Sequence, residues 1–262
     1  MKQLGTQTQF YSNQDGQFEI ELVQEVPIAI SINDLNYAVI MITPVDVEAF
    51  IVGFAYSEGL IIQANEILDI DINHVTSELE DVPTHIDANI KLTGRAQHRS
   101  SGIMRQRKGT SGCGLCGIEA IEQSFPQLAP LTASPSLKDQ QWLAAKQHFS
   151  EHQEVGGISG AIHGAMLLDA EGQFLCFAED IGRHNALDKL IGKALLNQIP
   201  LADMHILMSS RCSTELILKA VRAKVASLGH LASPSTLAVA QAKQYGLHLI
   251  HIPRQATPRY YN

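Results

Sequence analysis

The sequence predicts an α/β protein in which a smaller α+β region precedes a larger α/β region. From residue 155 onward, short apolar strands alternate with helical patterns over short connections, as in a sheet covered by helices. Before that, apolar residues at period two surround one helical pattern, which indicates an α+β arrangement. The chain has 262 residues, enough for one large core or a core with a smaller partner.

Composition along the chain divides it into three segments. We expect residues 1–110 to form the small α+β region, which ends in a basic loop. Residues 111–136 contain a Cys-x-x-Cys loop, a short helix and a proline-containing linker. Residues 137–262 form the α/β domain.

The first third reads as strands around one helix. Residues 1–16 are polar and predict a loose terminus. Thr43-Pro44 predicts the start of a helix that Thr43 caps and Gly59 ends. Asn33-Asp34 predicts a hairpin turn. Strands are predicted at residues 18–22, 26–30, 37–42, 67–75 and 85–92.

The middle of the chain changes character. Residues 94–110 are rich in arginine and poor in apolar side chains, which predicts a solvated, positively charged loop. After the cysteines, apolar residues at helical spacing predict a short helix over 118–125. Three prolines between residues 126 and 136 indicate a linker, and a helix is predicted over 137–151.

In the C-terminal half the regular alternation predicts a largely parallel sheet. Its strands are expected at residues 160–168, 174–177, 204–208, 226–231 and 247–252. Helices are expected through Leu187–Leu195 and at residues 213–225 and 234–245.

Charge and cysteine usage exclude several classes of protein. The formal net charge of −8 argues against non-specific nucleic-acid binding, which needs a basic surface. No apolar run approaches the roughly 20 residues that span a bilayer, and the N-terminus lacks a secretory apolar core. The four cysteines do not form a disulfide framework. We therefore expect a cytoplasmic protein that meets proteins and small ligands, with no nucleic-acid or membrane partner.

Three strand–helix junctions carry hydroxyl or basic side chains, at Gly182–Asn185, Ser209–Ser213 and Ser233–Ser235. Ligands of open parallel sheets bind at the carboxyl ends of strands, where helix N-termini and their N–H groups attract phosphates. Each junction alone could be only a helix cap, but the three together favour an anionic ligand. The last strand leads to a turn with Arg254 and Arg259, which could close over a nucleotide or stay a solvated tail.

Cys113 and Cys116 lie in a glycine-flanked Cys-x-x-Cys segment. A structural zinc site needs four ligands, and a zinc deaminase has an H-x-E before a P-C-x-x-C, an order that this chain lacks. We therefore predict no metal site. A dithiol redox pair and a purely structural pair remain alternatives. The basic residues Arg105, Arg107 and Lys108 and the following helix favour thiolate chemistry, because both lower a cysteine pKa.

Two runs of the sequence are distinctive, Gly112–Gly117 (GCGLCG) and Glu179–Lys189 (EDIGRHNALDK). Through them the chain resembles the FdhD/NarQ family of formate dehydrogenase accessory sulfurtransferases. The likeness runs from about residue 20 to the end. Shorter similar segments are Glu25–Ala29, Ala38–Gly59, Ser210–Glu215 and Ser233–Val239.

The resemblance implies both a fold and a function. The C-terminal domain would have a cytidine-deaminase-like, three-layer fold without the deaminase zinc site, and the protein would be a homodimer. It would take sulfur as a persulfide from a cysteine desulfurase and pass it to molybdenum bis(molybdopterin guanine dinucleotide), which is bound as a substrate. Formate dehydrogenase needs this sulfurated cofactor to be active.

The resemblance also assigns residues. Cys113 corresponds to the persulfide-bearing cysteine and Cys116 to its partner. The cofactor-binding residues expected from the family segment and from the junctions above are Ile252, Pro253, Arg254, Gln255, Ala256, Thr257, Arg183, His184, Ser210 and Arg211.

Two other functions remain open at this point. The chain could be a non-catalytic molybdenum-cofactor chaperone for formate dehydrogenase, whose cysteines only dock a partner. It could also be a dithiol oxidoreductase that acts on protein disulfides.

Overall fold

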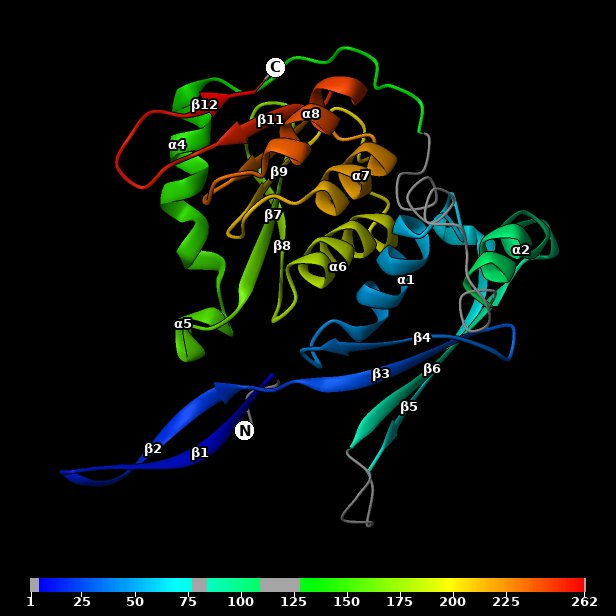
Figure 1. Cartoon of the computed structure of the whole chain (residues 1–262), viewed down its shortest axis with the longest axis horizontal. Coiled ribbons are helices and arrows are strands. Elements are labelled where there is room, and N and C mark those ends of the chain that lie inside the picture. Colours follow the sequence, from blue (N-terminus) through cyan, green and yellow to red (C-terminus); the bar gives the residue numbers. More distant parts are fainter. Residues whose placement is uncertain (1–4, 77–83, 109–127, 262) are drawn as a thin grey trace.

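The computed structural model describes residues 5–76, 84–108 and 128–261. Within these residues the strands form three sheets, of two, four and six strands (Figure 1). Figure 1 shows the four-stranded sheet below helix α1 and the six-stranded sheet beside α6, α7 and α8. The chain is therefore a mixed α/β protein, as the sequence predicts.

The four-stranded sheet has the order β4-β3-β6-β5. The strands are β3 (Val26–Ile32), β4 (Leu35–Ile42), β5 (Ile67–Val75) and β6 (His85–Leu92). The predicted hairpin joins β3 to β4, and both turn residues, Asn33 and Asp34, have the positive φ that a tight hairpin turn requires. The inward side chains of β3 and β6 pack on α1 (Val47–Ser57). The segment Ile67–Val75 is thus an ordinary strand of this sheet.

The start of α1 differs from the prediction. The helix begins at Val47, and its N-cap residue is Asp46 in the left-handed conformation, not Thr43. The buried Thr43 side chain instead accepts a hydrogen bond from the backbone N–H of Ile181, at 3.1 Å. Thr43 is therefore used to join distant segments. The predicted helix end is confirmed, because Gly59 follows it with a φ of 77°.

The described part of the basic segment is helical, so the predicted loop there is wrong. Helix α2 spans Gly94–Lys108, after the short 3-10 helix η1 (Ala64–Glu66) and β5 and β6. Arginine, lysine, glutamine and methionine favour helices even without an apolar stripe. Over residues 94–102, the part of α2 whose burial is described, the buried residues are Ala96 and Ser100. Arg99 pairs with Glu66 at 2.6 Å. A charged, poorly amphipathic sequence is therefore compatible with a helix at the edge of the molecule.

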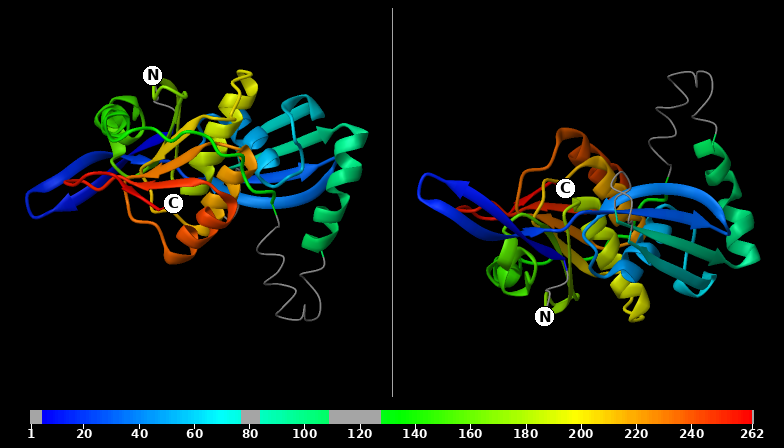
Figure 2. Two further views of the ribbon diagram at one scale, coloured as in Figure 1. Left: turned by 90° about the horizontal axis from the view of Figure 1, so that it is seen from above. Right: turned by 90° about the horizontal axis from the view of Figure 1, so that it is seen from below.

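The N-terminal segment is also more ordered than predicted. Strand β2 (Gly16–Val23) is confirmed, but residues 6–13 form its partner strand β1 (Thr6–Asn13). The alternation of threonine and glutamine with no buried face hides this strand from a hydrophobic-periodicity argument. The β1–β2 hairpin and α2 lie at opposite ends of the molecule (Figure 2).

The six-stranded sheet has the order β12-β11-β10-β9-β7-β8. Its strands are β7 (His163–Leu168), β8 (Phe174–Asp180), β9 (His205–Met208), β10 (Ser227–His230), β11 (His248–His251) and β12 (Arg259–Tyr260). The predicted strands are confirmed, but the sheet is mixed rather than largely parallel. Short turns join β7 to β8 and β11 to β12, and short turns enforce antiparallel pairing.

Strand direction places four carboxyl ends together. Strands β9, β10 and β11 are parallel, and β7 is antiparallel to both β9 and β8. Strand β8 therefore runs in the same direction as β9–β11. The C-terminal ends of β8, β9, β10 and β11 therefore lie on the same side of the sheet, here called the carboxyl edge. Their N-terminal ends lie on the opposite side, here called the amino edge.

Helices cover both faces of this sheet. On one face lie α6 (Arg183–Leu196), α7 (Thr214–Ala223) and α8 (Thr236–Tyr245). On the other lies α4 (Asp139–His148), whose Trp142 packs on Leu207 and Ile250, followed by η3 (Phe149–His152) and α5 (Gly156–Ser159). This layering agrees with the expected three layers, and the cytidine-deaminase-like relationship stays a prediction.

Helices α1 and α6 cross closely and join the two larger sheets. A Cβ atom placed on Gly192 would lie 1.8 Å from the carbonyl oxygen of Ala49. One placed on Gly53 would lie 1.7 Å from the carbonyl oxygen of Asp188. Only glycine permits two helix backbones to approach this closely.

Candidate functional site at the carboxyl edge

The carboxyl edge gathers the predicted binding segments. Strand β8 leads to Arg183 and His184, β9 leads to Ser210 and Arg211, and β11 leads to residues 252–257. The strand directions alone bring these segments to one side of the sheet. At the third predicted junction, the Ser235 hydroxyl accepts a hydrogen bond from the N–H of Ala238 at 3.1 Å, so there the side chain is a helix cap.

Most polar residues of the segment Glu179–Lys189 form hydrogen bonds or ion pairs with other parts of the chain. The carboxylate of Asp180 accepts hydrogen bonds from the N–H groups of Thr43 (3.0 Å) and Gly182 (2.7 Å) and from Nδ2 of Asn185 (2.9 Å). Lys189 Nζ lies 2.7 Å from Asp180 Oδ2. It also donates to the carbonyl oxygens of Thr43 and Glu179. These groups are saturated and buried, and so they are not available to a ligand.

Two further acidic residues of the segment are used in the same way. Glu179 accepts hydrogen bonds from the N–H groups of Val155 and Gly156, both at 2.9 Å. Asp188 pairs with Lys219 at 2.6 Å, while burial raises the pKa of its carboxyl. The segment that looks richest in chemistry therefore mainly holds the fold together.

Arg183 and His184 are the exceptions. They are the first residues of α6, and His184 Nε2 lies 3.2 Å from Ser213 Oγ and 2.8 Å from Glu215 Oε2. These contacts place the start of α7 beside the start of α6. Burial lowers the pKa of His184, and the carboxylate of Glu215 opposes that shift. Two helix N-termini, each with a partial positive charge, thus meet at this point.

Arg183 has unsatisfied hydrogen-bonding capacity. Its Nε is sealed from solvent and has no hydrogen-bond partner among the described residues. Its charge contributes to the lowered pKa of His163, after burial, and to that of His184. A half-buried guanidinium beside two helix N-termini is suited to a phosphate or another anion, because the anion would satisfy both the charge and the donors.

Ser210 and Cys212, which follow β9, are both buried. Ser210 is buried, and its carbonyl oxygen lies 2.9 Å from Nδ1 of His230, a fully buried residue whose pKa burial lowers to about 4. Burial raises the pKa of the Cys212 thiol to about 12. The Cys212 thiol therefore stays protonated at neutral pH, and this cysteine is a core residue rather than a nucleophile. Arg211, in contrast, is exposed.

The predicted segment 252–257 is the turn between β11 and β12. Ile252 is buried, and its N–H donates to the carbonyl oxygen of His230 at 2.8 Å. Lys146 Nζ donates to the carbonyl oxygens of Pro253 (2.5 Å) and Arg254 (3.0 Å). The remaining side chains of the turn are exposed: Arg254, Gln255, Ala256 and Thr257. The turn therefore has an anchored start and exposed side chains at the carboxyl edge.

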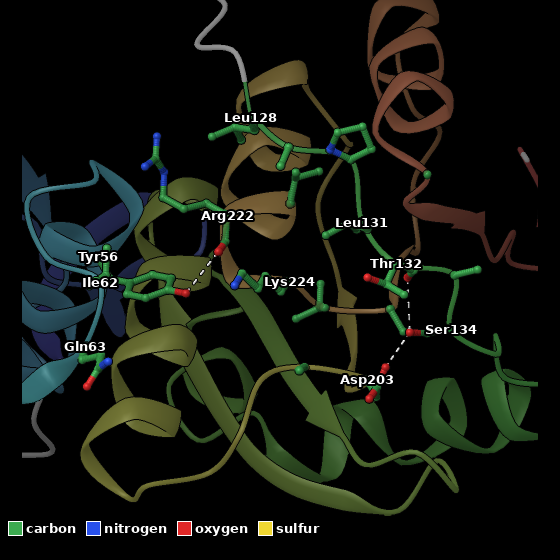
Figure 3. Close-up of a pocket in the computed structure, with 18 of the residues that line it drawn as sticks. Tyr56, Ile62, Gln63, Leu128, Leu131, Thr132, Ser134, Asp203, Arg222 and Lys224 are labelled. Carbon is green, nitrogen blue, oxygen red and sulfur yellow. Dashed lines mark hydrogen bonds between the residues drawn. The ribbon is translucent and has the colours of Figure 1, made fainter.

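Cys113 and Cys116 lie outside the described residues. The chain is described again from Leu128, and residues 128–134 line a cavity of about 890 Å³ (Figure 3). Other lining residues directly precede β9, β10 and β11, so the cavity opens at the amino edge. Tyr56 from α1 donates its hydroxyl to the carbonyl oxygen of Arg222 at 3.1 Å, and Lys224 stands beside them. The sequence predicts only a linker for this segment, and nothing in its pattern indicates a cavity.

The described residues contain no group of three or more histidine, cysteine or acidic side chains arranged to hold a metal ion. None of their helices is long and apolar enough to cross a membrane.

Comparisons with known proteins identify the family. The model of the FdhD/NarQ family matches residues 23–262. A protein named Sulfur carrier protein FdhD from Burkholderia cenocepacia is 37% identical over 236 residues, which cover 88% of this chain and 84% of that protein. One of the same name from Acinetobacter baylyi is 33% identical over 239 residues, covering 90% and 84%.

A solved structure shares the fold. It is the crystal structure of a formate dehydrogenase accessory protein from Desulfotalea psychrophila, with a TM-score of 0.71 and 23% sequence identity. The alignment covers 98% of this chain and 96% of that one. With the family model and the curated relatives, these findings confirm the resemblance seen in the sequence: the chain belongs to the FdhD/NarQ family.

Proposed function

We propose that this chain is a sulfur carrier that serves formate dehydrogenase. It accepts persulfide sulfur from a cysteine desulfurase and passes it to molybdenum bis(molybdopterin guanine dinucleotide). The observation that carries this proposal is the 37% identity, over most of both chains, to a protein named Sulfur carrier protein FdhD. The Cys-x-x-Cys segment supplies the thiols that such a role needs.

The sulfur chemistry is assigned to Cys113. Its thiolate attacks the terminal sulfur of the desulfurase persulfide, the donor cysteine leaves as a thiolate, and Cys113 then holds the sulfur as its own persulfide. Cys116 supplies the second thiol. Its thiolate either attacks the inner sulfur of the Cys113 persulfide, which forms a Cys113–Cys116 disulfide and releases hydrosulfide, or attacks the outer sulfur and takes it up while Cys113 leaves as a thiolate. Basic residues near these cysteines in the sequence favour the thiolate form.

The cofactor is the substrate and is assigned to the carboxyl edge. Arg183 and the starts of α6 and α7 would hold a phosphate of a guanine dinucleotide. His184 adds a donor at the same point, and Arg211 and Arg254 are the exposed basic groups at the ends of β9 and β11. The buried Nε of Arg183, which has no hydrogen-bond partner among the residues that the structure describes, supports this assignment. The expected partners are thus the desulfurase and formate dehydrogenase, in the cytoplasm, and the expected assembly is a homodimer.

A sulfur-loading experiment tests the proposal. The purified protein is incubated with a cysteine desulfurase and cysteine, and the mass of each variant is measured before and after treatment with a reductant. Wild type and Cys176→Ala should gain a reducible sulfur atom, and Cys113→Ala should not. Normal loading and normal activation of formate dehydrogenase by Cys113→Ala would refute the assignment.

The chaperone alternative makes a different prediction. If the cysteines only dock a partner, a Cys113→Ser/Cys116→Ser variant would still activate formate dehydrogenase. The sulfur-carrier proposal expects that variant to bind guanosine diphosphate like wild type but to leave the enzyme inactive.

A further inference from the structure

The cavity of about 890 Å³ at the amino edge continues into a second cavity of about 580 Å³. Tyr56, Ile62 and Lys224 line both of them, so the two adjoin and form one elongated hollow, here called the amino-edge trough. Either cavity alone has the size of a small-molecule pocket, which measures roughly 300–1,000 Å³. The two in series suit a longer ligand, such as an extended peptide segment.

Apolar side chains line both halves of the trough. They come from the segment before α4 and from the end of α6 and the turn after it: Leu128, Pro130, Leu131, Leu195, Leu196 and Ile199. Ile62, where the halves meet, is 57% exposed, and Leu196 is 41% exposed. Exposed apolar side chains gathered around a hollow indicate a binding site for another molecule.

Lys224 brings a charge without a counter-charge to the junction of the two halves, where it lies beside Tyr56 (Figure 3). Its ammonium group makes no hydrogen bond or ion pair with the residues that the structure describes. The other charged side chains of the lining are engaged. The Glu58 carboxylate interacts with Arg222, and Asp203 accepts a hydrogen bond from the Ser134 hydroxyl. The end of α7 offsets only about half an elementary charge, so the trough favours a carboxylate.

The backbone of Lys224 also indicates a function for this side chain. Lys224 follows α7 with a φ of 59°, a left-handed position that glycine usually occupies. Two more polar residues of the lining, Gln198 and Asp203, have similar φ values of 56° and 65°. Non-glycine residues held in this conformation cluster at functional sites. A lysine is thus kept here at a cost in stability.

The trough adjoins the elements that flank the two cysteines of the Cys-x-x-Cys segment in the chain. Leu128, the first described residue after them, lines it. Helix η1 also lines it, and the ion pair of Glu66 with Arg99 joins η1 to α2, the helix before the cysteines. The cofactor is assigned to the carboxyl edge, on the opposite side of the sheet. A protein seated in the trough would therefore leave the cofactor site open.

We propose that the amino-edge trough is the docking site for the protein that donates persulfide sulfur. The docked part is an extended segment with apolar side chains on both sides of a carboxylate. The carboxylate pairs with Lys224, and the apolar side chains cover Ile62 and Leu196. Because the occupant is the sulfur donor, this inference rests on the proposed function. It adds a separate surface for the sulfur donor, away from the cofactor.

Fluorescence anisotropy of a fluorescein-labelled cysteine desulfurase, titrated with the full chain, tests the charge. Lys224→Gln should weaken binding about 5-fold, because the ion pair is lost. Gln17→Glu makes the same change of net charge on the exposed strand β2, at the opposite end of the molecule from α2 (Figure 2). This control should bind like wild type.

A second pair of variants tests the apolar contact. Ile62→Ser should also weaken binding about 5-fold, because an apolar side chain that docking covers is lost. Val39→Ser, at an exposed position on β4, is its control and should bind like wild type.

Two further measurements separate docking from folding and from chemistry. Lys224→Gly removes the ammonium group and relieves the left-handed backbone, so its thermal midpoint should not fall while its binding weakens as in Lys224→Gln. Glutathione persulfide is a small sulfur donor that needs no docking surface. It should load Cys113 equally fast in wild type and in all of these variants, as measured by mass.

Three results would overturn the proposal. A wild type that does not bind the desulfurase, or wild-type affinity in both Lys224→Gln and Ile62→Ser, would refute docking in the trough. Equal slowing of loading from the desulfurase and from glutathione persulfide would show that the substitutions act on the cysteines. Normal loading with reduced activation of formate dehydrogenase would assign the trough to the sulfur acceptor.

Failure of the proposed function is distinguishable, because it appears in the wild type. The chain would then bind the desulfurase without gaining sulfur, and the affinities of the variants would still decide whether the trough is the docking site.

Discussion

The ammonium group of Lys189 lies 2.7 Å from Oδ2 of Asp180, and neither side chain is exposed to solvent. This pair joins α6 to the end of β8, and through the backbone of Thr43 it also reaches the segment before α1. Burial lowers the pKa of Lys189, and the Asp180 carboxylate opposes that shift. The pair and its hydrogen bonds therefore tie the two larger sheets together at their junction.

Removing one member of this pair should be costly. Lys189→Met leaves the Asp180 carboxylate buried without its counter-charge, and we expect a loss of about 3–5 kcal/mol in the free energy of unfolding. Urea unfolding followed by circular dichroism measures this loss. Lys243→Met, at an exposed position on α8, is the matched control and should remain close to wild type. A Lys189→Met protein as stable as the control would show that the pair is dispensable.

The crossing of α1 and α6 should not tolerate a single methyl group. Gly192→Ala places a Cβ within 1.8 Å of a backbone oxygen of α1. Because a backbone cannot move aside like a side chain, we expect destabilisation by about 2 kcal/mol or more in thermal unfolding.

A second glycine provides the control for that experiment. Gly102, in α2, has open space around its Cβ position, and Gly102→Ala should be neutral or slightly stabilising because alanine favours helices. Equal effects of the two substitutions would mean that helix propensity, and not the crossing, determines the result.

Anion binding at the carboxyl edge should depend on Arg183 and on pH. Burial and the charge of Arg183 keep the pKa of His184 below its ordinary value in the free protein. A bound phosphate raises that pKa, so binding takes up a proton and the affinity for guanosine diphosphate should increase as the pH falls from about 8 to about 6. Isothermal titration calorimetry at several pH values measures this dependence.

Substitutions distinguish the contribution of Arg183 to binding from the contribution of His184 to its pH dependence. Arg183→Met should weaken guanosine diphosphate binding at least ~10-fold at every pH. His184→Gln should flatten the pH dependence, whereas His148→Gln, at an exposed histidine on α4, should retain it. A pH dependence that survives in His184→Gln would assign the titrating group to another residue.

The two described cysteines should be poor nucleophiles. Burial raises the pKa of Cys176 to about 11 and that of Cys212 to about 12. Near neutral pH both remain protonated, so alkylation of the native protein should proceed at Cys113 and Cys116 at least ~10-fold faster. Peptide mass mapping after timed alkylation measures the four rates. The denatured protein, in which all four should react alike, is the control, and rapid native labelling of Cys212 would contradict the burial argument.

Local periodicity is why most elements could be predicted from sequence. Strands β3 and β6 bury alternate residues, and α7 buries residues at helical spacing, so the apolar pattern repeats at the period of the element. Strand β2 shows the same alternation of apolar residues although none of them is buried. The predictions for residues 6–13 and 94–108 were wrong because β1 has no apolar alternation and because, in the part of α2 whose burial is described (residues 94–102), Ala96 and Ser100 are the buried residues. The mixed direction of the six-stranded sheet was missed because direction depends on connection lengths and strand order, not on the strand itself.

By itself, the sequence determined the family and the segments that carry chemistry, because both reside in short runs such as Gly112–Gly117 and Glu179–Lys189. Only the tertiary structure decided which residues of the run Glu179–Lys189 are available. Asp180 and Lys189 are saturated by partners from distant segments, whereas Arg183, three residues after Asp180, has a buried donor with no partner in the described part of the chain. Burial and hydrogen bonding depend on residues far apart in the chain, and no local pattern specifies them.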